Sequence, residues 1–151
     1  MVADLAGQGL LSFLQAMQKK EPNGAGSCSR WRGGRGCVKI NCDGAMDVCR
    51  GRAGVGCVAR SDEGGFVWAA VRCFNSTGEA RLVEMQAVLF AIEIAKSKGI
   101  VGFVIESDDQ GLVQGLQKRS DTRGPFSLLQ EDILAQMVDC QIKMYLKLID
   151  L

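Results

Sequence analysis

The chain has 151 residues, of which 47% are hydrophobic and 23% charged, so it is long enough for one packed domain and too short for two ordinary ones. It contains no histidine, which excludes serine–histidine and cysteine–histidine nucleophiles. The net charge of +1 divides unevenly: residues 1–60 carry 9 Lys and Arg against 4 Asp and Glu, and residues 61–151 carry 9 against 13. This asymmetry suits a polyanion and cations as partners.

The first 26 residues predict a short helix and a flexible linker. Apolar side chains recur there at helical spacing, at Leu10, Leu11, Leu14 and Met17. Residues 23–27 then have the Gly- and Ser-containing composition of a linker. We therefore expect the main domain to occupy residues 31–151.

The main domain begins with three predicted strands. Residues 38–43 alternate apolar and polar, which is the period of a strand, and residues 53–60 and 66–74 predict two more. A turn of Asp, Glu and two Gly joins the last two strands, so we expect an antiparallel meander.

The pattern then becomes helical over residues 79–98 and ends at Gly99, a residue type that commonly terminates helices. The continuous apolar run over residues 100–105 predicts a strand buried on both faces. Two helices are predicted over 109–118 and 125–140, followed by a last strand over 142–151.

The cysteines and the hydropathy pattern bear on the compartment. The seven cysteines include no Cys-x-x-Cys pair, so the sequence does not indicate a structural zinc site. Their pattern instead indicates buried free thiols in a reducing compartment. The N-terminus lacks a secretory signal pattern, and no stretch reaches about 18 apolar residues. We expect a soluble intracellular protein of the nucleus or cytoplasm, without a membrane partner.

Three acids are candidates for chemistry. Glu84 lies on the small, apolar face of its predicted helix, where a carboxylate needs either a buried arginine or a metal ion. Asp108 ends the apolar run, either as a helix N-cap or as a ligand at the end of a buried strand. Asp43 ends the first predicted strand and lies either in a hairpin turn or in a functional site. The long loop before residue 53 disfavours a two-residue hairpin turn.

The order of the elements joins these acids into one predicted site. A right-handed crossover through helix 79–98 returns the chain to a strand parallel to the first one. Asp43 and Asp108 then lie on adjacent strands, with Glu84 on the helix that covers them. Oxygen ligands of this kind favour hard divalent cations.

Four segments in the same order resemble the plant reverse-transcriptase-like ribonuclease H domains. They are residues 38–45, residues 53–60, Glu84 with Ala87, and residues 106–110, and the resemblance covers about residues 31–145. It implies an α/β ribonuclease H-like fold: a mixed five-stranded sheet of order 3-2-1-4-5, flanked by helices.

The resemblance also implies an activity and a site. The activity is cleavage of the RNA strand of an RNA–DNA hybrid with two Mg²⁺ ions, or Mn²⁺ in their place. By position, Asp43, Glu84 and Asp108 are the metal ligands and catalytic residues. Gln110 matches a residue that contacts the hybrid in the minor groove, and we assign Gly44, Arg35 and Lys39 to nucleic-acid binding as well.

The sequence departs from the family at its end. The family has a further helix after the last strand, which carries a fourth acidic residue. Here the sequence stops at Leu151, and Asp150 falls inside the predicted last strand. We therefore expect a C-terminally truncated domain without the final helix, in which the second metal site and the activity are impaired.

The leading hypothesis is a monomeric ribonuclease H-type endonuclease that acts on RNA–DNA hybrid or another nucleic acid. One alternative is a catalytically inactive nucleic-acid-binding module of the same fold. A second alternative is a structural domain whose acids are helix caps and salt-bridge partners. A metal titration separates this second alternative from the other two.

Overall fold

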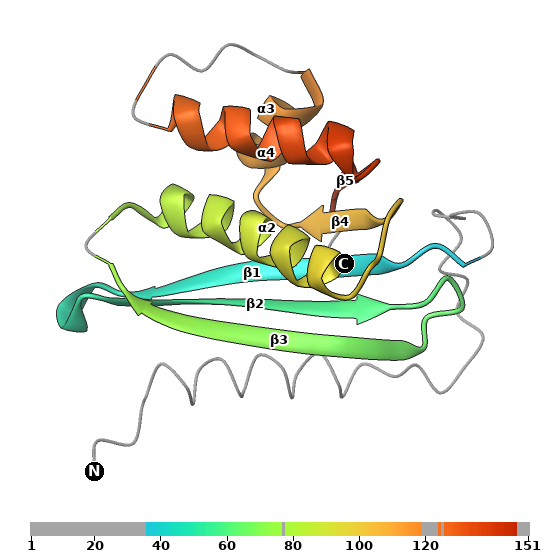
Figure 1. The fold of residues 1–151 in the computed structure, drawn as a ribbon. Helices are drawn as coiled ribbons and strands as arrows, with labels where there is room; N and C mark the ends of the chain where they lie inside the picture. Colours follow the sequence, from blue (N-terminus) through green and yellow to red (C-terminus); the bar gives the residue numbers. More distant parts are fainter. Residues whose placement is uncertain (1–35, 77, 119–123, 125, 148–151) are drawn as a thin grey trace.

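The computed structural model describes residues 36–76, 78–118, 124 and 126–147. The predicted N-terminal helix, the linker and Asp150 lie outside these residues. The described elements follow the predicted order of strands and helices (Figure 1). In chain order they are β1 (Lys39–Asp47), β2 (Arg52–Arg60), β3 (Phe66–Asn75), α2 (Ala80–Ser97), β4 (Val104–Ser107), α3 (Gln110–Lys118), α4 (Ser127–Asp139) and β5 (Lys143–Leu146).

The strands form one mixed sheet in the order β3-β2-β1-β4-β5, as predicted. Strand β2 pairs antiparallel with both β1 and β3, whereas β4 pairs parallel with β1 and with β5. Helix α2 supplies the crossover between β3 and β4, because a parallel partner for β1 cannot be reached by a tight hairpin. No helix among the described residues is both long and apolar enough to cross a bilayer.

Strand β1 continues beyond its predicted end. The prediction that Asp43 ends this strand is wrong, because β1 runs on to Asp47 and pairs with β2 throughout. The connection to β2 is a 3₁₀ turn, Val48–Arg50, in which the Asp47 carboxylate accepts from the Arg50 backbone N–H at 3.2 Å. Gly51 closes the turn at φ 60°. Asp43 therefore lies within a paired strand and not in a turn.

Strand β4 starts later than the predicted run over residues 100–105. Gly99 and Gly102 have φ of 71° and 72°, values that extended backbone does not adopt. The strand forms only from Val104, whose N–H donates to the carbonyl oxygen of Val38 at 2.9 Å. The predicted last strand is also shorter in its described part, because β5 ends at Leu146.

The core lies between the sheet and α2. The small-residue stripe predicted for this helix is buried, and Ala87, Val88, Ala91 and Ala95 each expose 0% of their surface. Small side chains allow the helix axis to approach the sheet closely, where it meets the buried Ile40 of β1. Burial of one such aliphatic side chain contributes about 1.5–3 kcal/mol. Figure 1 shows α2 running along β1 and β2, with α3 and α4 on the same side of the sheet.

Candidate metal centre

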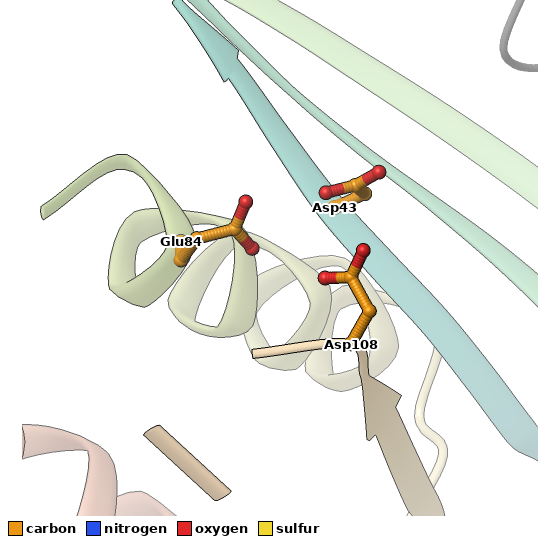
Figure 2. A group of neighbouring side chains, drawn as sticks. All are labelled: Asp43, Glu84 and Asp108. Carbon is orange, nitrogen blue, oxygen red and sulfur yellow. The ribbon is translucent and has the colours of Figure 1, made fainter. Parts of the chain in front are cut away.

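Three carboxylates meet where the first turns of α2 pass the sheet. Asp43 comes from the middle of β1, Glu84 from the second turn of α2, and Asp108 directly follows β4. One oxygen of each carboxylate lies within 4.8 Å of an oxygen of the other two. Figure 2 shows the three side chains converging from these three elements. We call this group the acidic cluster.

The register of the parallel strands brings the two aspartates together. Asn41 of β1 is the partner of Glu106 of β4. Asp43 and Asp108 each lie two residues further along these parallel strands, so both emerge at the same end of the strand pair. The predicted adjacency of the first and fourth strands is confirmed.

Gly44 admits the helix that carries the third acid. A Cβ atom at Gly44 would lie 2.7 Å from Val83 Cγ1 and 3.0 Å from the Val83 carbonyl oxygen, distances too short for a real side chain. The absence of a Cβ therefore lets α2 pack against β1 at the residue before Glu84. The N–H of Gly44 also donates to Asp43 Oδ1 at 2.9 Å, which orients that carboxylate.

Asp109, and not Asp108, is the N-terminal cap of α3. Asp109 Oδ1 accepts from the backbone N–H of Leu112 at 3.0 Å, so Asp109 caps α3. Ser107 Oγ accepts from the N–H of Asp109 at 3.2 Å and supports the same turn. Asp108 is thereby left outside the cap, with its carboxylate in the acidic cluster.

Burial and the charges of neighbouring acids raise the pKa values of two members of the cluster, Glu84 and Asp43. Burial raises the pKa of Glu84 to about 8, and the charge of Asp43 adds to the effect. The pKa of Asp43 is raised as well, first by burial and then by the charge of Asp108. The charge of Lys147 lowers the pKa of Asp43 and so offsets part of its shift.

No salt bridge neutralises the acidic cluster within the described part of the chain. Among the described residues, no lysine or arginine forms a salt bridge with Asp43, Glu84 or Asp108. Glu84 Oε2 is buried and has no hydrogen-bond partner in this part of the chain. The alternative of a buried salt bridge from Glu84 to an arginine is therefore wrong for the described residues.

The donor set fits a hard divalent cation. Three carboxylates from separate elements offer only oxygen, which Mg²⁺ and Mn²⁺ prefer to nitrogen or sulfur. The unpartnered Oε2 of Glu84 is an acceptor that a cation would satisfy. A charge of +2 would also remove the repulsion that raises the two pKa values.

The remaining predicted site residues have varied surroundings. Gln110 is the first residue of α3 and is exposed, close in sequence to Asp108. Lys39 Nζ lies 3.2 Å from Glu106 Oε1, so its charge has an internal partner. Arg35 lies outside the described residues.

The sequence analysis did not single out Arg81. It lies one helical turn before Glu84, and its Nη2 is 3.6 Å from Asp109 Oδ1. The sequence signal that could have identified Arg81 is its position three residues before Glu84, because residues at that spacing share a helix face. Arg81 places a positive charge beside the acidic cluster without a salt bridge to it.

Comparison with known proteins agrees with this architecture. The sequence profile of a family described as reverse transcriptase-like matches residues 41–149. No curated protein matches the sequence. The solved structures described next resemble the fold at less than 25% sequence identity.

Three of these structures are ribonucleases H. The RNase H1 of the archaeon Halobacterium salinarum NRC-1 has a TM-score of 0.62 at 23% identity, over 74% of this chain and 86% of that one. The N-terminal RNase H domain of rv2228c from Mycobacterium tuberculosis has a TM-score of 0.63 at 18%, over 74% and 82%. LC11-RNase H1, solved in complex with RNA/DNA hybrid, has a TM-score of 0.65 at 15%, over 73% and 84%.

Proposed function

The chain belongs to the reverse transcriptase-like family, and on this premise we propose that it is a ribonuclease H-type nuclease that hydrolyses the RNA strand of an RNA–DNA hybrid. The observation that carries the proposal is the acidic cluster: three carboxylates from β1, α2 and the end of β4, with no salt bridge to a lysine or arginine among the described residues. Support for the substrate comes from LC11-RNase H1, a protein of the same fold bound to RNA/DNA hybrid.

Asp43, Glu84 and Asp108 would hold the divalent cations, with Mg²⁺ as the first candidate and Mn²⁺ as the second. Bound Mg²⁺ supplies an activated water at neutral pH and neutralises charge on the leaving 3′ oxygen. The N–H of Gly44 keeps one oxygen of Asp43 oriented at 2.9 Å, so that the carboxylate enters the site in one rotamer. Glu84 releases its proton when it becomes a ligand, because only the carboxylate form coordinates.

Other side chains would hold the nucleic acid. The exposed Gln110 offers an amide that can donate and accept in a minor groove, next in the chain to the Asp109 cap. Selection of RNA over DNA would come from contacts to the 2′-hydroxyl, which DNA lacks. Arg35 and Lys39 are proposed as phosphate contacts because they are basic, and Gly44 is proposed as a further contact to the nucleic acid.

The test is cleavage of a hybrid labelled on its RNA strand, with Mg²⁺ and with EDTA. Asp43→Asn is compared with Asp47→Asn, because both aspartates lie on β1 and only Asp43 belongs to the acidic cluster. We expect Mg²⁺-dependent cleavage by the parent chain and by Asp47→Asn, and none by Asp43→Asn. Cleavage that is equal in Asp43→Asn and the parent would reject the proposal.

An inactive binding module of the same fold is the alternative, and it gives a different result in the same assay. Such a module would retain hybrid in a gel-shift experiment and would release no RNA fragment at any Mg²⁺ concentration. The assay is repeated with Mn²⁺ in place of Mg²⁺, as a control that distinguishes an inactive module from an active site that binds Mg²⁺ weakly.

A further inference from the structure

A pocket of about 390 Å³ opens between α2, α3 and α4, beside the acidic cluster. Its volume falls in the range of small-ligand sites, about 300–1,000 Å³. Two features connect it with the cluster. Arg81, one of its lining residues, lies one turn before Glu84 on α2 and is 3.6 Å from the Asp109 carboxylate, next to Asp108.

The lining divides into a cationic and an apolar part. Arg81 and Lys118 are exposed cations, and the Arg81 side chain keeps 45% of its surface in water. Met85 and Leu112 are 2% and 4% exposed, so they belong to the floor of the pocket, and Phe126 is half-buried beside them. An anionic group attached to a flat apolar group would satisfy both parts.

Arg81 is available to a ligand in spite of its acidic neighbour. The separation of 3.6 Å from Asp109 is longer than a good charge-assisted hydrogen bond, and a guanidinium has five N–H donors. Gly111 in the first turn of α3 creates the space that Arg81 occupies, because a Cβ there would collide with the guanidinium. The Arg81 side chain therefore lies against the first turn of α3, where it lines the pocket.

We propose that this pocket binds one unpaired nucleotide of the nucleic acid held at the acidic cluster, an inference that rests on the proposed function. The phosphate lies against Arg81 and Lys118, and the base lies against Phe126 and the apolar floor. The nucleotide must be unpaired, because a base inside a pocket cannot also pair with the opposite strand. Hybrids with a single-stranded overhang are thus the preferred substrates.

The first experiment uses AMP and inorganic phosphate as probes, in EDTA and without hybrid. Both are titrated into ¹⁵N-labelled protein, and the backbone amide signals of Gly111, Leu112 and Phe126 are followed. We expect AMP to shift these signals with an affinity at least about fivefold above that of phosphate, because aromatic stacking strengthens base binding. Equal affinities for AMP and phosphate would overturn the proposal.

Variants locate the binding within the pocket. Phe126→Leu keeps an apolar side chain but loses the ring, and Arg81→Gln removes the cation; each should weaken AMP about five- to tenfold. The control is Lys98→Gln, which removes one positive charge at the other end of α2, roughly 25 Å from Arg81 at 1.5 Å per residue. Equal weakening by Arg81→Gln and Lys98→Gln would show general electrostatic attraction and overturn the site.

The second experiment separates a free nucleotide from a nucleotide of the substrate strand. Binding of a blunt hybrid is compared with that of the same hybrid carrying one unpaired nucleotide, in Ca²⁺. We expect about fivefold tighter binding with the overhang, and loss of this gain in Phe126→Leu. AMP binding without any overhang gain overturns the proposed substrate contact. AMP binding and an overhang gain without cleavage in Mg²⁺ support the pocket and reject only the proposed nuclease activity.

Discussion

Two glutamates of α2 have opposite surroundings. Glu84 and Glu93 are nine residues apart, which at 100° per residue places them on opposite faces of the helix. Glu93 faces solvent and receives two hydrogen bonds of 3.0 Å from the Arg72 guanidinium, which lower its pKa. Glu84 faces the sheet, and burial beside Asp43 and Asp108 raises its pKa to about 8.

The difference separates a structural acid from a candidate ligand. Glu93 has its own counter-ion, so its charge is balanced within the fold. Glu84 has none among the described residues, and its nearest charged neighbours are like charges. A fold that keeps such a group close to two other acids gains from a cation taken from solution. The comparison therefore predicts opposite responses of the two positions to substitution, pH, metal and salt.

The largest expected effect is on catalysis. Glu84→Gln removes an anionic oxygen from the acidic cluster and should lower the rate of hybrid cleavage by about 10²–10³-fold, because a proposed metal ligand is lost. Each loss of about 1.4 kcal/mol of transition-state stabilisation lowers the rate tenfold. Glu93→Gln is the matched control on the same helix and should change the rate by less than about twofold. Single-turnover cleavage in Mg²⁺ measures both. A large loss in both variants would mean that the helix, and not the cluster, is sensitive to substitution.

The second effect is on stability against pH in the absence of metal. Because the folded-state pKa of Glu84 is raised from 4.5 to about 8, the folded protein binds more protons than the unfolded chain between these values. The unfolding free energy should therefore fall as pH rises through this window. We expect a total change of about 1–3 kcal/mol, less than the full pKa shift corresponds to, because Glu84 is only partly buried and solvent screens its charge. Urea denaturation at pH 5 and pH 8 in EDTA measures it. Glu84→Gln should flatten the dependence, and an equally steep curve in that variant would contradict the assignment.

The third effect is stabilisation by metal. At Mg²⁺ concentrations several times the dissociation constant, we expect a gain in unfolding free energy on the order of 1 kcal/mol, because the ion binds only the folded cluster. Asp43→Asn should raise the stability in EDTA, where it relieves repulsion, and should lose most of the response to Mg²⁺. Thermal melts with Mg²⁺ and with EDTA measure this. An identical Mg²⁺ response in Asp43→Asn and Asp47→Asn would remove the cluster as the metal site.

The sequence was sufficient for the fold because the connectivity permits few topologies. A three-stranded meander, a helix and a parallel strand predict β4 next to β1, and this adjacency is confirmed. The full strand order was implied by the family resemblance, and it is confirmed as well. The small-residue stripe at Ala87 and Ala91 likewise predicted which face of α2 is buried. Among the described residues, the largest differences from the predicted elements lie at the boundaries of strands. Strand β4 begins late because of the φ of Gly102, which composition does not reveal.

The candidate site was predicted as a set of residues and not in its details. Nothing local distinguishes Asp108 from Asp109, and only the hydrogen bond from Leu112 identifies Asp109 as the cap. Gly44 was assigned to nucleic acid, whereas its contact with Val83 gives it a packing role that becomes visible only when α2 is placed on β1. Long-range contacts of this kind depend on the assembled fold, and a sequence pattern does not specify them.

The smallest expected effect is loss of the Arg72–Glu93 salt bridge. The Glu93 side chain is 59% exposed, so its charge is largely screened, and Glu93→Gln should lower the unfolding free energy by only about 0.2–1 kcal/mol. The sign is opposite to that of Asp43→Asn in EDTA, which should raise the unfolding free energy. Because the folded pKa of Glu93 is lowered, its contribution is present above the unfolded pKa and is lost as pH falls through the folded value. In 1 M NaCl the Debye length is about 3 Å, so the difference in unfolding free energy between Glu93→Gln and the parent should shrink.

Arg72→Gln should lower the unfolding free energy more than Glu93→Gln does, because the Arg72 guanidinium also lies 4.6 Å from the centroid of the Phe90 ring. Urea denaturation of the two variants at low and high salt gives all four values. A salt-independent loss in Glu93→Gln would show that Glu93 contributes by packing, and the contrast between the two glutamates would then not be electrostatic.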